Sequence, residues 1–187
     1  YETLKNRYPN VRILTWKKEF NYSAINNFAV REARGEYLLF LNNDVEIITE
    51  SWLEEMLQLC QQKDVGMAGA KLYYPDDTIQ HAGVVVGLGG VAAHVLCKLP
   101  RDAEGYMGRL RCVQEISAVT AACMMVKTSV FKAVGGFDEE LKVAFNDIDL
   151  CMKVRKYGVK IVFTPYAELY HYESKSRGME DTPEKQL

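Results

Sequence analysis

The feature that most constrains the fold is a short apolar run that ends abruptly in polar side chains. Tyr37-Leu38-Leu39-Phe40-Leu41 is followed directly by Asn42-Asn43-Asp44-Val45-Glu46. A continuous apolar run of this length is typical of a strand buried on both faces, as in the parallel sheets of α/β proteins. Ligand sites in such proteins lie at the carboxyl edge of the sheet, where this strand would present its acids. The run therefore predicts an α/β fold with a site directly after residue 41.

A second acidic cluster, Asn146-Asp147-Ile148-Asp149-Leu150, occurs late in the chain. Apolar residues follow at helical spacing up to Tyr157, which predicts a helix that ends before Gly158 and has Asn146 or Asp147 as its N-cap. Carboxylates in a first helical turn are favoured by the helix dipole, so the cluster has a purely structural interpretation. Together with the first cluster it also has a chemical one, in which one cluster holds a divalent cation and the other supplies a base.

The rest of the pattern alternates short apolar runs with helical periodicity. Strands are predicted at residues 11–14, 36–41, 65–72, 119–126 and 159–163, and helices at residues 23–33, 51–61, 128–133 and 147–157. Residues 81–111 are glycine-rich and too long for an ordinary connection, and loops of this kind are usually functional or mobile. These elements predict one α/β domain with a mixed, mainly parallel sheet flanked by helices.

Composition excludes several classes of protein. The chain is 48% apolar and 26% charged, as in soluble globular proteins, and its net charge of -2 gives no basic surface for nucleic acid. No segment reads as a signal peptide or a membrane span. Five cysteines without CxxC or CxxH spacing argue against a disulfide framework or a zinc site. We therefore expect a reducing compartment, the cytoplasm, with the inner face of the membrane as a further location.

The motifs occur in an order that resembles a known family. They are Tyr37 to Asp44, Trp52-Leu53, Gly135-Gly136-Phe137-Asp138-Glu139, Asn146-Asp147-Ile148-Asp149-Leu150 and His171-Tyr172-Glu173. The ordered set, from about Val11 to Arg177, resembles the inverting family 2 glycosyltransferases of the GT-A fold. Within that family, it is most similar to the rhamnosyltransferase-like enzymes of bacterial surface polysaccharide assembly.

The resemblance implies a single, partial GT-A domain over residues 1–187. Residues 1–50 would be the end of the nucleotide-binding half, residues 51–173 the acceptor and catalytic half, and residues 174–187 a flexible tail. The family's nucleotide-binding half begins with a strand, a helix and a second strand. We therefore expect that such a unit, about 30 residues or more, is missing ahead of Tyr1.

For the donor side, the resemblance implies a nucleotide-diphosphate sugar and a divalent cation. The family's DxD-type motif falls here on Asn42 and Asp44, so Asp44 is the expected metal ligand, with His171 as a second. Oxygen and imidazole ligands suit Mn²⁺ or Mg²⁺, the cofactors that we expect. Asn42, Asn27 and Arg177 are the expected contacts to the nucleotide sugar.

For the acceptor side, the resemblance implies a general base at Asp147. Inverting transfer needs a carboxylate within hydrogen-bond reach of the acceptor hydroxyl. Asn146, Asp138 and Phe137 are the expected contacts to a glycan or lipid-linked acceptor.

Two alternatives to an active transferase remain open from the sequence. The amides of Asn42 and Asn146, where the family usually has acids, favour a non-catalytic GT-A-like fragment that binds glycan or protein. Acids at strand ends also serve phosphoryl chemistry, so a metal-assisted phosphohydrolase is a minor alternative. A missing unit would leave a sheet edge exposed, and we expect self-association through that edge.

Overall fold

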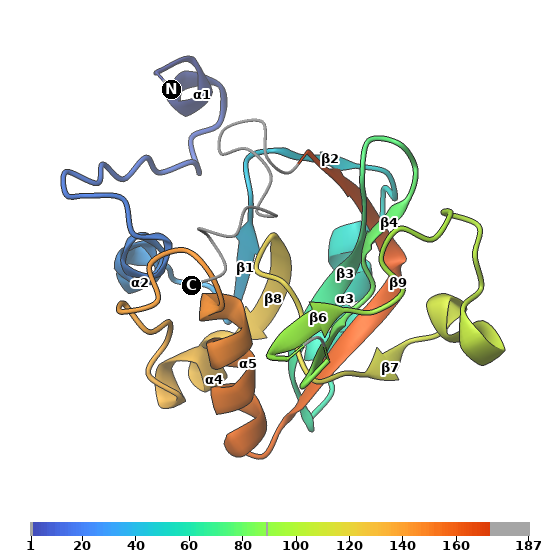
Figure 1. The fold of residues 1–187 in the computed structure, drawn as a ribbon. Coiled ribbons are helices and arrows are strands. Elements are labelled where there is room, and N and C mark those ends of the chain that lie inside the picture. Colours follow the sequence, from blue (N-terminus) through green and yellow to red (C-terminus); the bar gives the residue numbers. More distant parts are fainter. Residues whose placement is uncertain (1, 89, 173–187) are drawn as a thin grey trace.

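The computed structural model describes residues 2–88 and 90–172 of the 187-residue chain. Its centre is a mixed β-sheet with helices on both faces (Figure 1), so the predicted α/β class is confirmed. The helices are α1 (Glu2–Arg7), α2 (Tyr22–Glu32), α3 (Trp52–Cys60), the 3-10 helix η1 (Tyr106–Arg111), α4 (Thr128–Ala133) and α5 (Asn146–Lys156). The strands are β1 (Tyr37–Leu41), β2 (Val45–Ile47), β3 (Val65–Tyr73), β4 (Ile79–His81), β5 (Val84–Val86), β6 (Ala92–His94), β7 (Gln114–Glu115), β8 (Cys123–Lys127) and β9 (Lys160–His171).

The order of the main sheet is β1-β8-β3-β9-β2, with β4 added to β3 and β7 added to β9. Strands β3 and β9 are parallel, whereas the other pairings in this sheet of the described chain are antiparallel. The prediction of a mainly parallel sheet is therefore wrong. A strand buried on both faces has a continuous apolar run whether its neighbours are parallel or antiparallel, so the run does not indicate strand direction. Strand β8 lies between β1 and β3 and is antiparallel to both. Self-association through a sheet edge stays a prediction.

The sheet directions bring three strand ends to one edge. β3 runs parallel to β9 and antiparallel to β8, and β8 runs antiparallel to β1. The carboxyl ends of β1, β3 and β9 therefore lie at the same edge of the sheet. This edge carries Asn42 and Asp44 after β1 and His171 at the end of β9.

Several predicted boundaries differ from the observed ones. Residues 11–14 form no strand in the described structure, where they are exposed, and β8 begins at Cys123 because residues 121–122 form a turn. Strand β9 continues through Pro165 to His171, with a shift of register against β3 between Gly69 and Lys71. A proline is tolerated at such an irregularity because no ladder hydrogen bond is required of its nitrogen. Residues 81–111, predicted as irregular, contain the β5–β6 hairpin and η1.

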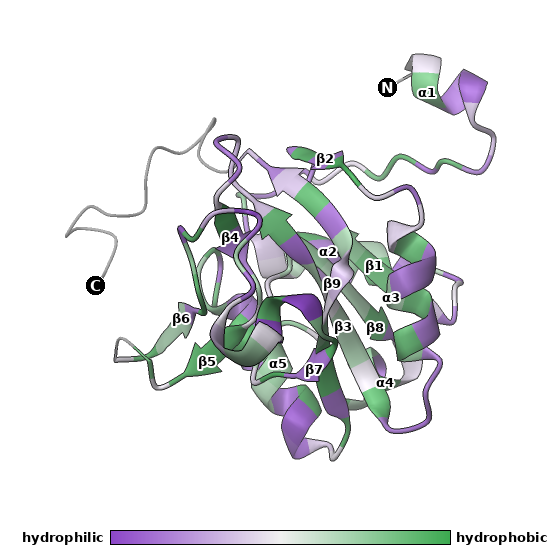
Figure 2. Ribbon diagram, turned by 90° about the vertical axis from the view of Figure 1, so that its right-hand side faces the viewer, coloured by the Kyte–Doolittle hydropathy of each residue, from purple (hydrophilic) through white to green (hydrophobic). Residues whose placement is uncertain are grey.

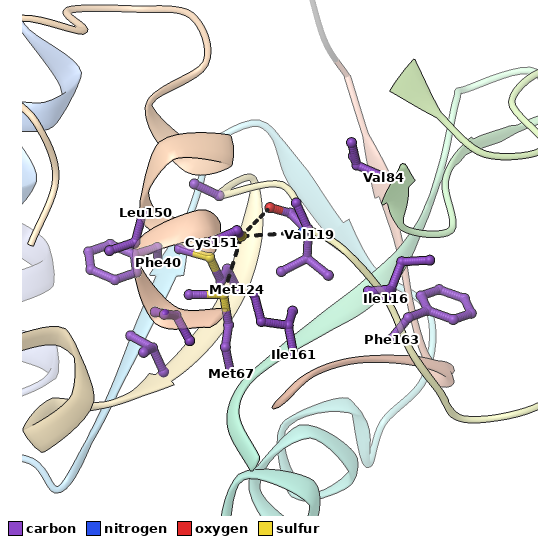
Figure 3. Packing of buried hydrophobic residues seen from close by; sticks show 14 of the residues in the cluster. Phe40, Met67, Val84, Ile116, Val119, Met124, Leu150, Cys151, Ile161 and Phe163 are labelled. Carbon is purple, nitrogen blue, oxygen red and sulfur yellow. Dashed lines mark hydrogen bonds between the residues drawn. The ribbon is translucent and has the colours of Figure 1, made fainter. Parts of the chain in front are cut away.

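Two apolar clusters, one on each face, hold the sheet in place. On one face α2, α4 and α5 cover Phe40, Met67 and Met124. The thiol of Cys151 in α5 donates to the backbone carbonyl of Val119 and accepts from the backbone N–H of the same residue (Figure 3). On the other face, α3 buries Trp52, Met56, Leu59 and Cys60 and keeps its polar residues outward (Figure 2). Each large buried side chain contributes about 1.5–3 kcal/mol, so these clusters fix the strand ends that form the site.

Two further findings bear on the predicted class of protein. All five cysteines lie in described segments and have free thiols. Within residues 2–88 and 90–172, the helices are too short or too polar to pass through a bilayer.

Candidate active site

Asp44 and His171, the two predicted metal ligands, meet at the carboxyl edge of the sheet. After β1 the chain turns at residues 43–44, and β2 then pairs with the end of β9, which places Val45 opposite His171. Asp44 Oδ1 lies 3.3 Å from His171 Nε2, and the Asn42 side-chain amide lies 3.1 Å from the same nitrogen. Residues separated by most of the chain therefore form one cluster.

Gln80 of β4 orients the imidazole ring of His171. Its Oε1 lies 2.8 Å from His171 Nδ1, and its Nε2 donates to the His171 backbone carbonyl at 3.3 Å. Because an amide oxygen can only accept, Nδ1 must carry the proton. The Asn42 amide nitrogen can only donate, so Nε2 carries no proton and accepts from it, which is the tautomer that a metal-binding histidine requires.

The cluster around Asp44 suits a divalent cation. Asp44 Oδ1 is buried without a hydrogen-bond partner in the described chain and lies 3.3 Å from His171 Nε2, which carries no proton. Two unprotonated acceptor atoms at this distance repel each other unless a cation lies between them. A carboxylate oxygen and an imidazole nitrogen form a donor set that fits Mn²⁺. Within residues 2–88 and 90–172, no third His, Cys, Asp or Glu joins this pair as a candidate ligand.

Asp147, the predicted base, is held at the start of α5. Its Oδ2 accepts from the backbone N–H of Ala121 at 3.2 Å, and its Oδ1 accepts from Ile148 N at 2.8 Å. The prediction of Asn146 or Asp147 as N-cap is wrong, because the helix begins after Phe145, whose backbone is left-handed. Asp147 lies inside the first turn, half-buried, and its carboxylate is directed toward residue 121.

Residues 120–122 join the two acidic clusters into one site. The backbone N–H of Asn42 donates to Ala122 O at 3.0 Å, and the neighbouring Ala121 N–H donates to Asp147. Successive Cα atoms are about 3.8 Å apart, so Asn42 and Asp147 are held against adjacent residues. The backbone of this segment, with its small side chains, thus places the predicted metal site beside the predicted base.

Tyr22 is a member of this site that the sequence analysis missed. Its hydroxyl donates to Ala121 O at 3.2 Å, and burial, together with the negative charge of Asp147, raises the pKa of the Tyr22 hydroxyl. The hydroxyl therefore stays protonated and is a neutral neighbour of the carboxylate. Neither Tyr22 nor Gln80 lies in a recognisable motif, and only the folded structure shows their positions.

His81 is buried beside the same segment and pairs with His94. Its Nδ1 lies 2.8 Å from His94 Nδ1, and the backbone N–H of Thr120 donates to its Nε2 at 3.4 Å. Because Nε2 accepts, the proton of the neutral ring is on Nδ1, which donates to His94. Burial, with His94 and His171 nearby, lowers the pKa of His81 well below 6.5.

Two residues predicted to contact substrates have structural partners within the protein. Phe137 is 3% exposed and packs edge-to-face on Phe40, with ring centroids 5.0 Å apart, and its contact with the acceptor stays a prediction. Asn27, predicted to bind the donor, accepts from Phe137 N at 3.0 Å and donates to Phe137 O at 2.9 Å. Its amide therefore holds the loop of Phe137 against α2.

The other predicted contacts have mixed outcomes. Asn146 is 4% exposed and donates to Val143 O at 3.0 Å, so its amide holds the loop ahead of α5, and its contact with the acceptor stays a prediction. Asp138 accepts from Glu140 N at 2.9 Å within its turn, and its contact with the acceptor stays a prediction. Arg177 and the predicted tail lie outside the described residues.

Comparison with known proteins adds the family and the fold. The family described as "Glycosyltransferase like family" matches residues 9–186. An "O-antigen biosynthesis protein RfbC" from Myxococcus xanthus is 42% identical over 94% of this chain, and the Sinorhizobium fredii protein y4gI is 58% identical over 94%. The chain spans only 14% and 19% of the lengths of these two relatives.

A solved structure shares the fold at low sequence identity. GalNAc-T7, solved with UDP, GalNAc and Mn²⁺, matches 97% of this chain and 36% of its own, with a TM-score of 0.74 and 12% identity. This similarity shows the GT-A fold.

Proposed function

This chain belongs to the glycosyltransferase-like family, as a family 2 member with a GT-A fold, and we propose that it takes part in sugar transfer for polysaccharide synthesis. The donor would be a nucleotide-diphosphate sugar and the acceptor a glycan or a lipid-linked sugar, with inversion at the anomeric carbon. The relative named for O-antigen biosynthesis supports this class of product. The observation that carries the proposal is the joining of Asn42 and Asp147 by consecutive residues, Ala122 and Ala121.

On the donor side, Asp44 and His171 would hold the divalent cation, Mn²⁺ or Mg²⁺. When bound, such an ion supplies Lewis-acid stabilisation of the leaving diphosphate. Gln80 keeps His171 in the tautomer whose Nε2 can bind the ion. The presence of UDP and Mn²⁺ in GalNAc-T7 supports this assignment, and donor contacts from Asn42 and Arg177 remain part of the proposal.

On the acceptor side, Asp147 would act as the general base. As the acceptor oxygen bonds to the anomeric carbon and the bond to the diphosphate breaks, the hydroxyl proton would pass to the Asp147 carboxylate. The N–H groups of Ala121 and Ile148 fix the orientation of this carboxylate, and a lone pair stays available for the proton. Positioned proton transfer of this kind contributes about 10²–10⁴-fold in rate.

A non-catalytic binding domain is the second candidate. The amide of Asn42, at a position where the family usually has an acid, lowers the negative charge around Asp44 and favours this alternative. Sugar transfer that depends on a divalent cation would exclude it.

Metal binding in the presence of nucleoside diphosphate separates the two candidates. In a calorimetric titration of the protein with Mn²⁺ and UDP or GDP, Asp44→Ala should lose most of the metal affinity. Glu46→Gln is the matched control, because Glu46 is the next acid along the chain and its carboxylate is bonded to the Tyr172 hydroxyl. Equal metal affinity in Asp44→Ala and the wild type would contradict the metal assignment.

A further inference from the structure

A pocket of about 560 Å³ opens between the ends of β3 and β9. It is lined by the turn at residues 76–78, by residues 100–103 and by Arg111 at the end of η1. Glu168 and Tyr170 belong to the face of β9 that α5 covers, whereas His171, next along the strand, points to the other face. The pocket is therefore separate from the Asp44–His171 cluster, and it lies on the sheet face that carries Asp147.

Lys71 of β3 is the unusual residue of this pocket. It is 5% exposed, and its ammonium has no hydrogen bond or ion pair within the described residues. Its ammonium lies over the ring of Tyr73, whose centroid is 5.3 Å from Nζ. Burial lowers the pKa of Lys71, Glu168 opposes that change, and the like charges of Arg101 and Arg111 lower the pKa further. An ammonium on a side chain that is largely removed from water is costly without a counterion, and a partner can reach Lys71 from the pocket.

Four carboxylates line the pocket, and the two that lie beside Arg101 already have partners. Glu168 lies 3.5 Å from Arg101 and accepts from the Tyr73 hydroxyl. Asp77 lies 3.5 Å from the same guanidinium and accepts from the Tyr170 hydroxyl. Glu168 and Asp77 thus offset the charge of Arg101, and Arg111 pairs with Glu104 at 3.0 Å. Lys71 is the cation of the pocket that makes no ion pair within the described chain.

The charges decide which ligand the pocket can take. A cation beside Lys71 would meet its unpaired ammonium, so a cationic ligand is disfavoured there. A neutral sugar would leave the ammonium of Lys71 without an opposite charge. An oxyanion would pair with Lys71 and could also accept from either arginine, because guanidinium groups match carboxylate and phosphate geometry.

We propose that this pocket binds an oxyanion, a phosphate or a carboxylate, carried by the acceptor, with Lys71 as its main partner. The assignment of this oxyanion to the acceptor rests on the proposed transfer function and on the position of the pocket, which lies on the same face of the sheet as Asp147. Anion binding itself depends on neither, so it can be tested without donor or metal.

The test is the titration of the protein, in EDTA, with two small probes. Inorganic phosphate represents a phosphate-bearing acceptor and glucuronate represents a carboxylate-bearing one. We expect at least one probe to bind and to raise the pKa of Lys71, followed by NMR of its side chain. Binding of one probe alone identifies the anion that the pocket prefers.

Substitutions then locate the binding. Lys71→Met should weaken the probe affinity at least 10-fold, and Arg111→Gln should weaken it several-fold. Arg109→Gln is the matched control, since Arg109 is exposed on the same segment, pairs with Gln114 and does not line the pocket. Arg111 is exposed, so its variant stays informative even if Lys71→Met fails to fold.

Three outcomes would overturn the proposal: no binding of either probe, unchanged binding in both variants, or equal loss in Arg109→Gln and Arg111→Gln. The proposed transfer function is tested separately, by substitutions of Asp44 and Asp147. Their substitution should leave phosphate and glucuronate binding unchanged.

Discussion

Replacement of Gln80 by leucine should weaken divalent-metal binding at Asp44, although Gln80 is not a proposed ligand. Gln80 is 4% exposed and makes two hydrogen bonds to His171, one to Nδ1 at 2.8 Å and one to the backbone carbonyl at 3.3 Å. Leucine has a similar volume and can form neither bond. The proton on Nδ1 then loses its acceptor, and the ring is free to rotate or to change tautomer.

The magnitude follows from these contacts. A typical hydrogen bond contributes about 0.5–1.5 kcal/mol, and a buried donor left unpaired costs about 1–3 kcal/mol. We therefore expect the free energy of unfolding to fall by about 2–4 kcal/mol. Loss of such an outer partner typically lowers metal affinity about 10–100-fold.

The matched control is Gln80→Glu, which keeps an oxygen acceptor for the Nδ1 proton and loses only the donor to the carbonyl. Titration of Mn²⁺ followed by electron paramagnetic resonance, with UDP or GDP present, should show weak binding in Gln80→Leu and near wild-type binding in Gln80→Glu. NMR of the imidazole nitrogens should show a protonated Nδ1 in the wild type. An unprotonated Nδ1, or equal Mn²⁺ affinity in all three proteins, would refute the reasoning.

Two further predictions concern the frame around the site. The unfolded chain protonates His81 below about pH 6.5 while the folded state keeps it neutral, so stability should fall by about 1.4 kcal/mol per pH unit below that value. Denaturant unfolding at pH 7.5 and 5.5 measures this loss, and an equally large loss in His81→Gln would exclude His81 as its cause. Gly136→Ala should destabilise the protein by about 1–3 kcal/mol more than Gly135→Ala. Both glycines have positive φ, but a Cβ on Gly136 would lie 2.8 Å from Asn27 Oδ1, whereas a Cβ on Gly135 would have no atom within 4 Å. Thermal unfolding of the two variants checks this difference, and equal destabilisation would contradict it.

Elements with strong local patterns could be predicted from the sequence. Apolar periodicity predicts helix α5 and strand β1, and the predicted ends of both elements lie within about one residue of the observed ones. The order of motifs also predicted that Asp44 and His171 bind the same metal ion, and the structure places their side chains 3.3 Å apart. Local composition and motif order were sufficient for these features.

Features that depend on long-range pairing could not be predicted in this way. Strand direction, the three-residue β2 and the continuation of β9 past Pro165 are decided by neighbouring strands. Gln80, Tyr22 and Lys71 lie in unremarkable segments and gain their chemical setting only from partners far along the chain. Phe137 and Asn146 lie in the expected motifs, but packing turned both side chains into the interior.

The central claim is that Asp147 acts as the base of a sugar-transfer site next to the Asp44–His171 pair. Its most direct test is the rate of sugar transfer by Asp147→Asn, measured together with the affinity for the donor. Asp149→Asn is the control, because Asp149 lies in the same helical turn and pairs with Lys153 at 2.6 Å. We predict that Asp147→Asn binds the donor like the wild type and transfers about 10²–10⁴-fold more slowly, while Asp149→Asn keeps most of its rate. Wild-type turnover in Asp147→Asn would contradict the account.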